Sequence, residues 1–442
     1  MITLLDYLLL PLYLVIFYYI AKFYSRKIQS PEVRKYFINA FWLRMAGAIL
    51  YSMIVVYYYG YGDSMMYFTG SSFIREAIRE NDFISIFFMK ASELSKMAGQ
   101  YRIGPYAQGT IGVESNLVLI RLATLVSYIS FNCYLIVSLF MGFIAFVGSW
   151  KLYSTFNDIM GKRSPKYLAY IILYTPSIWF WGSGLLKESI CMCALGVAIN
   201  SLYKIMIKKK YAFRDVFFLL FSIYLLFSTK SYIAGILLAS LAAAMIAHFI
   251  ISRSTFLSKV AISFLIFSVG AILFYYTAAG YVEDVVEESA SMILTSKTMY
   301  AQEIEDGGAG SFSTPDFDMS ITGLLLRSPI AAFTTLYRPF IWETRNLMML
   351  FSTLESFIIL MATLYLLFKL RVFRFFSITF SDPVLIFCFV FSVLMATIVG
   401  LTTFNFGTLV RYRLPLLPFY GFLLLSLYTY KKKTAPPAAI TG

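Results

Sequence analysis

The sequence predicts an all-α integral membrane protein that crosses the bilayer many times. Of its 442 residues, 60% are hydrophobic and only 14% are charged, whereas about 25% of the residues in an average soluble domain are charged. Apolar runs of about 18 to 25 residues recur along almost the whole chain, and each is long enough to cross the roughly 30 Å hydrocarbon layer as a helix. Short basic clusters separate these runs. We therefore expect about eleven transmembrane helices, with interfacial helices in the outer loops.

The first apolar run, 3–23, contains Asp6 and is followed by Arg26, Lys27, Arg34 and Lys35. Because basic loops stay in the cytoplasm, this asymmetry places the N-terminus outside and the C-terminal tail, 431–442, inside. Further inner clusters lie at 162–166, 208–214, 253–259 and 369–374. The remaining predicted spans are 37–59, 132–152, 167–182, 188–206, 214–228, 232–251, 259–278, 347–368, 383–402 and 413–430.

Three segments depart from a simple crossing. Residues 116–131 are amphipathic, which fits a re-entrant or an interfacial helix as well as a span. Spans 167–182 and 214–228 are short for a full crossing. Prolines and glycines around 176–184 are also typical of helices that break where they line a cavity, since exposed backbone is tolerated at membrane depth only there.

Two outer loops are large, and both belong to one predicted transmembrane domain, 1–430. Loop 60–131 alternates glycine, tyrosine and amphipathic pieces, which predicts helices lying along the membrane surface. Loop 279–345 holds the main acidic cluster and a stretch, "EDGGAGSFSTPDFD", that is rich in turn-forming residues.

Composition excludes several classes of function. The net charge of +14 is spread between apolar runs and not gathered on one face, so it reports topology and not nucleic-acid binding. The four cysteines lie in or beside apolar runs, so we expect neither a disulfide nor a zinc site. The only histidine, His248, lies near an inner span end, which argues against a histidine-dependent metalloenzyme or hydrolase triad. No phosphate-loop or dinucleotide motif occurs, and the first run lacks the features of a cleavable signal.

Polar residues gather at the outer ends of the predicted spans. Positive charge there opposes the orientation rule and is costly unless it is paired with negative charge. A lipid diphosphate or an anionic glycan would supply that charge, because an arginine fork holds two phosphate oxygens at once. The alternative is ion pairing within the protein, such as Lys187 with Glu188 or Glu343 with Arg338 or Arg345, or contact with lipid headgroups. The outer set is Asp63, Lys187, Glu188, Lys230, Arg327, Arg338, Glu343, Arg345, Arg411 and Arg413.

Asp63 lies directly after an apolar run, in "YYYGYGDSMMYF". A carboxylate at this border fits a general base that takes the proton from an acceptor sugar hydroxyl while cations opposite steady a departing lipid phosphate. It also fits an N-cap of the helix that follows. The tyrosines at 57, 58, 59, 61 and 67 favour an interfacial aromatic belt over a sugar platform.

"GDSMMYF", "PSIWFWGSGLLKES", "YRPFIWE" and "NFGTLVRYRLPLLP" resemble segments of O-antigen polymerase-like proteins and of the GT-C glycosyltransferase superfamily. The likeness is diffuse and spans most of the chain. It implies an enzyme that takes sugars from polyprenyl phosphate or diphosphate carriers on the outer face of the bacterial inner membrane. It also implies Asp63 as the base and Arg338, Arg411 and Arg413 as ligands of the lipid diphosphate. The acidic loop here follows the second span, whereas in GT-C proteins it follows the first, and the polymerases usually have more spans.

We therefore expect a glycosyltransferase or polysaccharide polymerase with a lipid-linked donor. Asp63 is the expected catalytic residue. No cofactor is required, and a divalent metal has no support in the spacing of carboxylates. Expected partners are the polyprenyl-linked glycan, membrane lipids and envelope polysaccharide assembly proteins. The alternatives are a flippase that moves lipid-linked glycans without chemistry and a scaffold subunit of an envelope complex. The expected substrate-binding residues are Arg338, Arg411, Arg413, Lys187, Lys230, Glu188 and Arg345.

Overall fold

The computed structural model describes residues 1–101, 103–251, 294–295, 298–299, 312, 321–344 and 347–430. Within these residues the chain forms helices and no strands, as the sequence predicts. Residues 102, 252–293, most of 296–320, 345–346 and 431–442 lie outside the description, and with them the predicted span 259–278, most of loop 279–345 and the basic tail.

Seven helical segments in the described part are long and apolar enough to cross a membrane. An eighth would follow if the bent pair α6 (Pro105–Ile111) and α7 (Glu114–Ile129), which meet at 99°, formed one span. The structure thus supports a membrane protein with several spans and does not confirm the count of about eleven. The long helices are α1 (Leu4–Ser25), α2 (Pro31–Ile54), α8 (Tyr134–Ile159), α11 (Lys187–Leu202), α12 (Phe213–Ile251), α15 (Leu347–Leu370) and α17 (Pro383–Thr402).

Two predicted spans are shorter or broken in the structure. Segment 167–182 forms two short helices, α9 (Pro165–Ile172) and α10 (Pro176–Trp181). The chain breaks between them because Pro176 has no N–H to continue the first helix and disfavours a helical residue before it. Segment 413–430 becomes α19 (Leu417–Tyr428), of only 12 residues, and the preceding residues form turns.

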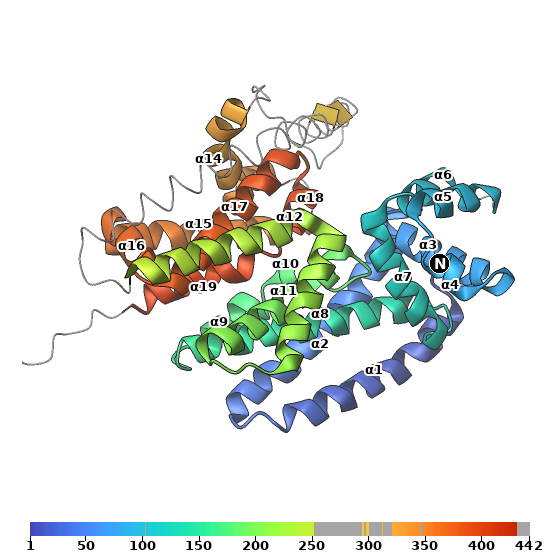
Figure 1. The fold of residues 1–442 in the computed structure, drawn as a ribbon, viewed down its shortest axis with the longest axis horizontal. Coiled ribbons are helices and arrows are strands. Elements are labelled where there is room, and N and C mark those ends of the chain that lie inside the picture. The colour runs from blue at the N-terminus through green and yellow to red at the C-terminus, as the bar shows by residue number, and fades with distance from the viewer. Residues whose placement is uncertain are drawn as a thin grey trace, which may run out of the picture.

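The predicted boundary between spans 214–228 and 232–251 coincides with a break inside α12. Lys230 has φ −143° and ψ 82°, which are not helical values, and the two halves of α12 run in different directions from it (Figure 1). Two other helices end in a π-helical turn: Val55–Tyr59 extends α2, and Tyr203–Ile207 extends α11. Such turns are rare in proteins, and those that occur are often found at functional sites.

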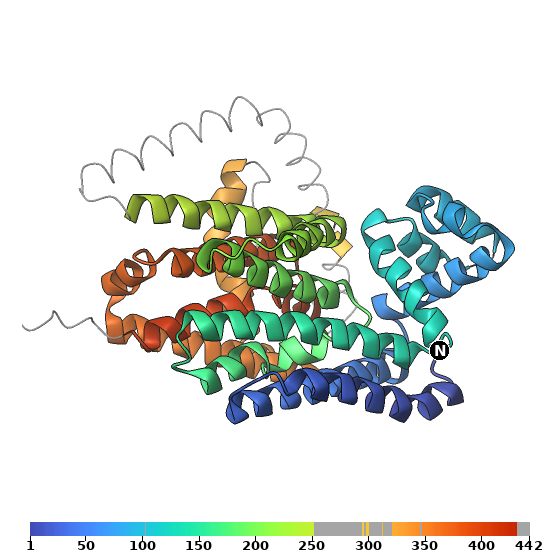
Figure 2. The ribbon, with the colours of Figure 1, turned by 60° about the horizontal axis from the view of Figure 1, so that its bottom comes forward.

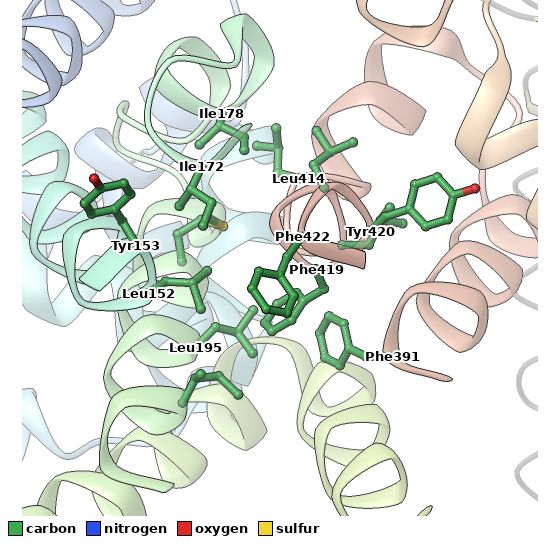
Figure 3. Close-up of a cluster of buried hydrophobic side chains, with 14 of the residues drawn as sticks. Leu152, Tyr153, Ile172, Ile178, Leu195, Phe391, Leu414, Phe419, Tyr420 and Phe422 are labelled. Carbon is green, nitrogen blue, oxygen red and sulfur yellow. The ribbon is translucent and has the colours of Figure 1, made fainter. Parts of the chain in front are cut away.

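The hydrophobic core joins the central helices to the C-terminal part of the chain. Aromatic rings meet there at close range: Phe156 of α8 stacks on Phe422 of α19 at 4.1 Å, and Phe391 of α17 meets Phe419 at 4.4 Å between centroids. Figure 3 shows this cluster with side chains from α8, α9, α10, α11, α17 and α19. The core therefore fixes the position of α18 (Phe406–Tyr412), which directly precedes α19.

Loop 60–131, which the sequence predicts to lie outside, is a folded helical lobe. It contains α3 (Asp63–Glu80), α4 (Phe83–Phe87), α5 (Ala91–Gln100), α6 and α7. Their buried core includes Ile74, Leu94 and Ile120 and continues into α2, α8 and α11. Figure 2 shows the lobe at one end of the helical bundle. The prediction of helices in this loop is confirmed, but they pack on one another as well as on the bundle.

The two ends of the bundle differ in character. At the end that carries the lobe, the Asp6 carboxylate of α1 accepts a hydrogen bond from the Leu135 N–H of α8 at 2.8 Å, and the hydroxyls of Tyr7 and Tyr57 meet at 2.8 Å. Three turns beside predicted inner basic clusters lie at the opposite end in both views: α1–α2, α8–α9, and α15 to α16 (Val372–Thr379) (Figures 1 and 2). The basic turns and Asp63 therefore belong to opposite ends.

Candidate functional site

Asp63 is the first residue of α3, and residues 60–62 connect it to the π-helical end of α2 at Tyr59. The connection turns at Gly60 (φ 70°) and Gly62 (φ 150°), conformations that favour glycine. The N-cap position belongs to Gly62, with no side-chain cap. Instead, the Asp63 carboxylate lies 2.8 Å from a terminal nitrogen of Arg411, and its side chain is 48% exposed. The Asp63 side chain makes no capping contact, so the alternative prediction that Asp63 is the N-cap of this helix is wrong.

Arg411 sits in the last turn of α18, opposite the face that this helix buries. The Asn405 side chain begins α18 by accepting hydrogen bonds from the N–H groups of Gly407 (2.8 Å) and Thr408 (3.3 Å). Phe406, Leu409 and Val410 are buried, which fixes the helix and leaves Arg411 facing Asp63. The Nε of Arg411 lies 3.4 Å from the Glu188 carboxylate.

Glu188, in the first turn of α11, connects Arg411 to Lys230. Its Oε1 lies 2.8 Å from the Lys230 Nζ, and the two side chains are only 3% and 10% exposed. The Lys230 ammonium also lies 3.7 Å from the centre of the Tyr412 ring, a favourable cation–π contact. Lys230 reaches this position from the break in α12. Asp63, Arg411, Glu188 and Lys230 thus form a chain of alternating charges, called here the ionic chain.

The ionic chain alters the electrostatics of the groups around it. Burial alone lowers the pKa of Arg411, but the nearby carboxylates of Glu188 and Asp63 outweigh it and hold that pKa above its usual range. Burial, reinforced by the charge of Asp63, raises the pKa of the Tyr67 phenol. Arg411 is therefore a permanent cation and Tyr67 a neutral hydroxyl at physiological pH.

A pocket of about 540 Å³ opens beside Asp63 and Arg411. A volume of this size fits a sugar or a small ligand group. Its wall comes from the end of α2, from α10, from α15 and from α18, so segments far apart in sequence meet here. Six of the sixteen lining residues are aromatic, and five others have polar side chains. The lining includes Tyr51, Tyr59, Tyr61, Asp63, Trp181, Ser352, Asn405, Phe406, Thr408, Arg411 and Tyr412.

Lys187 stands apart from the ionic chain. Its ammonium donates a hydrogen bond to the Ser115 hydroxyl of α7 at 2.8 Å, which joins the lobe to the bundle. The alternative prediction of a Lys187–Glu188 ion pair is wrong, because Glu188 pairs with Lys230 and Arg411 instead.

Arg338 and Arg413 form a second polar group behind the pocket wall. The Arg338 guanidinium forms an ion pair with Glu343, and its Nε lies 3.0 Å from the carboxylate. This pair was the alternative prediction from the sequence. It also lies 5.1 Å from the ring of Phe406, which lines the pocket. Arg413 is fully buried, with a terminal nitrogen 2.8 Å from the Arg338 carbonyl and another 3.5 Å from the Glu355 carboxylate. Of the three arginines expected to bind diphosphate, Arg411 alone lines the pocket. Arg345 lies outside the described residues.

Sequence reasoning missed most of the pocket wall. Tyr412 could have been suspected, because it stands between two arginines in "RYR", but Trp181 and Asn405 carry no such signal. Arg44, which the apolar pattern marks as an exception within a span, is buried and donates hydrogen bonds to the carbonyls of Ile178 (2.7 Å) and Gly182 (2.8 Å). It therefore holds the turn that precedes Lys187 and Glu188.

Comparison with known proteins found no family model, curated protein or solved structure that matches the chain. Across the part of the chain that the structure describes, no three histidine, cysteine, aspartate or glutamate side chains are grouped as metal ligands.

Proposed function

We propose that the protein is a membrane-embedded glycosyltransferase or polysaccharide polymerase that uses a polyprenyl phosphate- or diphosphate-linked donor. The observation that carries this proposal is the meeting of Asp63 and Arg411, 348 positions apart in sequence, at the mouth of one pocket. A carboxylate can serve as the general base and a fixed guanidinium can stabilise a departing phosphate in such a transfer.

In the proposed reaction, Asp63 accepts the proton of an acceptor hydroxyl as that oxygen bonds to the anomeric carbon. The bond from this carbon to the donor phosphate breaks, and the leaving phosphate keeps the electron pair. Arg411 stabilises the negative charge that develops on it. Arg411 keeps its positive charge throughout, because the carboxylates around it raise its pKa. Glu188 and Lys230 hold Arg411 and the neighbouring Tyr412 in place.

The pocket is proposed to open on the outer face of a bacterial inner membrane. The support is the separation of the basic turns, which favour the cytoplasm, from the end that carries Asp63 (Figures 1 and 2). In this orientation the N-terminus lies outside and the C-terminus inside, and the donor reaches the pocket from the outer leaflet.

The test is a transfer assay with purified protein in lipid nanodiscs and a polyprenyl diphosphate-linked oligosaccharide. Wild type lengthens or transfers the glycan, and Asp63→Asn loses at least about 100-fold in rate, as expected for a general base. The matched control is Asp82→Asn, because Asp82 caps α4 through the Ser85 N–H and asparagine caps equally well. Wild-type turnover in Asp63→Asn would remove the base assignment.

A flippase is the second candidate, and the buried charges favour it. Glu188 and Lys230 lie within span-length helices, and α12 is broken at Lys230, as the discontinuous helices of transporters are. The same nanodisc assay, repeated in sealed vesicles, separates the two candidates. An enzyme changes the glycan, whereas a flippase moves the lipid between leaflets and leaves its glycan unchanged.

A further inference from the structure

The contact between Asp63 and Arg411 leaves no room for the reaction proposed above. A base and a leaving phosphate stand on opposite sides of the anomeric carbon during inversion, so several ångströms must separate the two protein groups. In the structure their nitrogen and oxygen atoms are 2.8 Å apart. The structure therefore corresponds to a resting state, in which the Asp63 carboxylate occupies the anion-binding face of Arg411.

Asp63 is the partner that is free to move. Its side chain is 48% exposed, against 17% for Arg411. The segment that carries it turns through Gly60 and Gly62, and this segment, with Tyr59 and Tyr61, forms part of the pocket wall. The release needs rotation of the Asp63 side chain and not of the backbone after it, because Ser64 is buried and its hydroxyl meets that of Tyr134 at 2.7 Å.

Arg411 is held from its other side. Its Nε faces Glu188, which is itself fixed by Lys230, and α18 is anchored by buried Leu409 and Val410. The four groups of the ionic chain sum to zero charge, because two cations face two carboxylates. Without Asp63, the remaining three carry one net positive charge directed at the pocket.

We propose that Asp63 is a built-in competitor for the anion site of Arg411, and that a phosphate or diphosphate group binds there by displacing it. Binding of the anion and release of Asp63 are then one event. The donor phosphate takes the guanidinium, and the carboxylate becomes available to an acceptor hydroxyl only when the donor is in place. The identity of the ligand rests on the proposed function, but the exchange itself rests on the ion pair.

The experiment measures binding without turnover, by calorimetry on the full chain in nanodiscs. One arm uses inorganic diphosphate and the other a polyprenyl diphosphate that carries no sugar, which distinguishes a free anion from a lipid headgroup. Asp63→Asn and a second variant, Asp63→Ser, are compared with wild type and with Asp82→Asn. Removal of a partly exposed competing charge is expected to tighten binding about threefold to tenfold in both Asp63 variants. The gain should shrink as salt rises, because salt screens exposed pairs.

Equal or weaker binding by the Asp63 variants would overturn the proposal, and so would the absence of binding to every form. Arg411→Lys keeps the charge but loses the fork, so it should bind at least about tenfold more weakly than wild type; wild-type affinity in it would also overturn the proposal. The result is independent of transfer activity. Tighter binding by Asp63→Asn together with no transfer by wild type would keep the anion exchange and reject the glycosyltransferase.

Discussion

The contact between Glu188 and Lys230 predicts a large coupling free energy in a double-mutant cycle. Both side chains are almost fully buried, at 3% and 10% exposure, and their charged atoms are 2.8 Å apart. At an effective dielectric constant of about 20, two unit charges at this distance attract by about 6 kcal/mol. Desolvation offsets part of this attraction, so we expect a net coupling of about 2 to 4 kcal/mol.

The cycle compares wild type with Glu188→Gln, Lys230→Met and the double variant. Glu188→Gln should be the most destabilising single change, by about 3 to 5 kcal/mol, because it leaves Lys230 and Arg411 without the carboxylate that they share. The double variant should recover much of that loss. The assay is unfolding by SDS in mixed micelles, followed by far-ultraviolet circular dichroism, which measures the free energy of unfolding of each form.

A second ion pair of the same chain is a matched control. Lys204 and Asp215 lie 3.0 Å apart, but their side chains are 30% and 8% exposed. Because solvent screens the more exposed pair, its coupling should be at most about 1 kcal/mol. Equal coupling in the two pairs, or a Glu188–Lys230 coupling below about 1 kcal/mol, would refute the argument that burial makes the ionic chain a rigid support for Arg411.

Two further predictions concern stability. Gly196→Ala should destabilise the protein by several kcal/mol, because a Cβ at this position would lie 1.9 Å from the Gly148 carbonyl oxygen of the packed helix α8. Gly235→Ala is its control: nothing lies within 4 Å of the added carbon, so the midpoint of SDS unfolding should stay the same or rise. Arg413→Gln should lower the free energy of unfolding by about 3 to 5 kcal/mol, because it removes the cation beside the buried Glu355 carboxylate. Arg338→Gln should cost about 1 kcal/mol or less, since the Arg338–Glu343 pair is partly exposed. A larger loss in Arg338→Gln than in Arg413→Gln would reverse the roles assigned to the two arginines.

Much of the helical pattern follows from the sequence. The bounds of α1, α15 and α17 lie within about three residues of the predicted spans, because long apolar runs mark all three helices and Pro383 marks the start of α17. An interruption near Lys230 was also predicted, since a lysine lies there between two apolar runs, but the structure has a break inside one span-length segment, Phe213–Phe249, and not two separate spans. The sequence does not predict the shortening of 413–430 or the two π-helical turns, because hydropathy carries no information about the backbone hydrogen-bonding pattern.

The predicted site separates into two parts for a geometric reason. Arg411 and Arg413 are two positions apart, and residues with this spacing lie on nearly opposite sides of a helical turn. One therefore faces the pocket, while the other faces the buried backbone around Arg338. A single sequence does not tell which of two such arginines faces the pocket. It also does not predict the contact between Asp63 and Arg411, because these residues are 348 positions apart and meet only in the folded chain.

We propose that a lipid-linked donor binds with its phosphate at Arg411 and its sugar in the adjoining pocket. A structure of the Asp63→Asn variant with a polyprenyl diphosphate-linked saccharide would show where the donor lies. We predict phosphate oxygens within hydrogen-bond distance of the Arg411 guanidinium and a sugar ring beside Tyr61 and Trp181. A donor whose phosphate lies at the basic end of the bundle, or away from Arg411, would contradict the account.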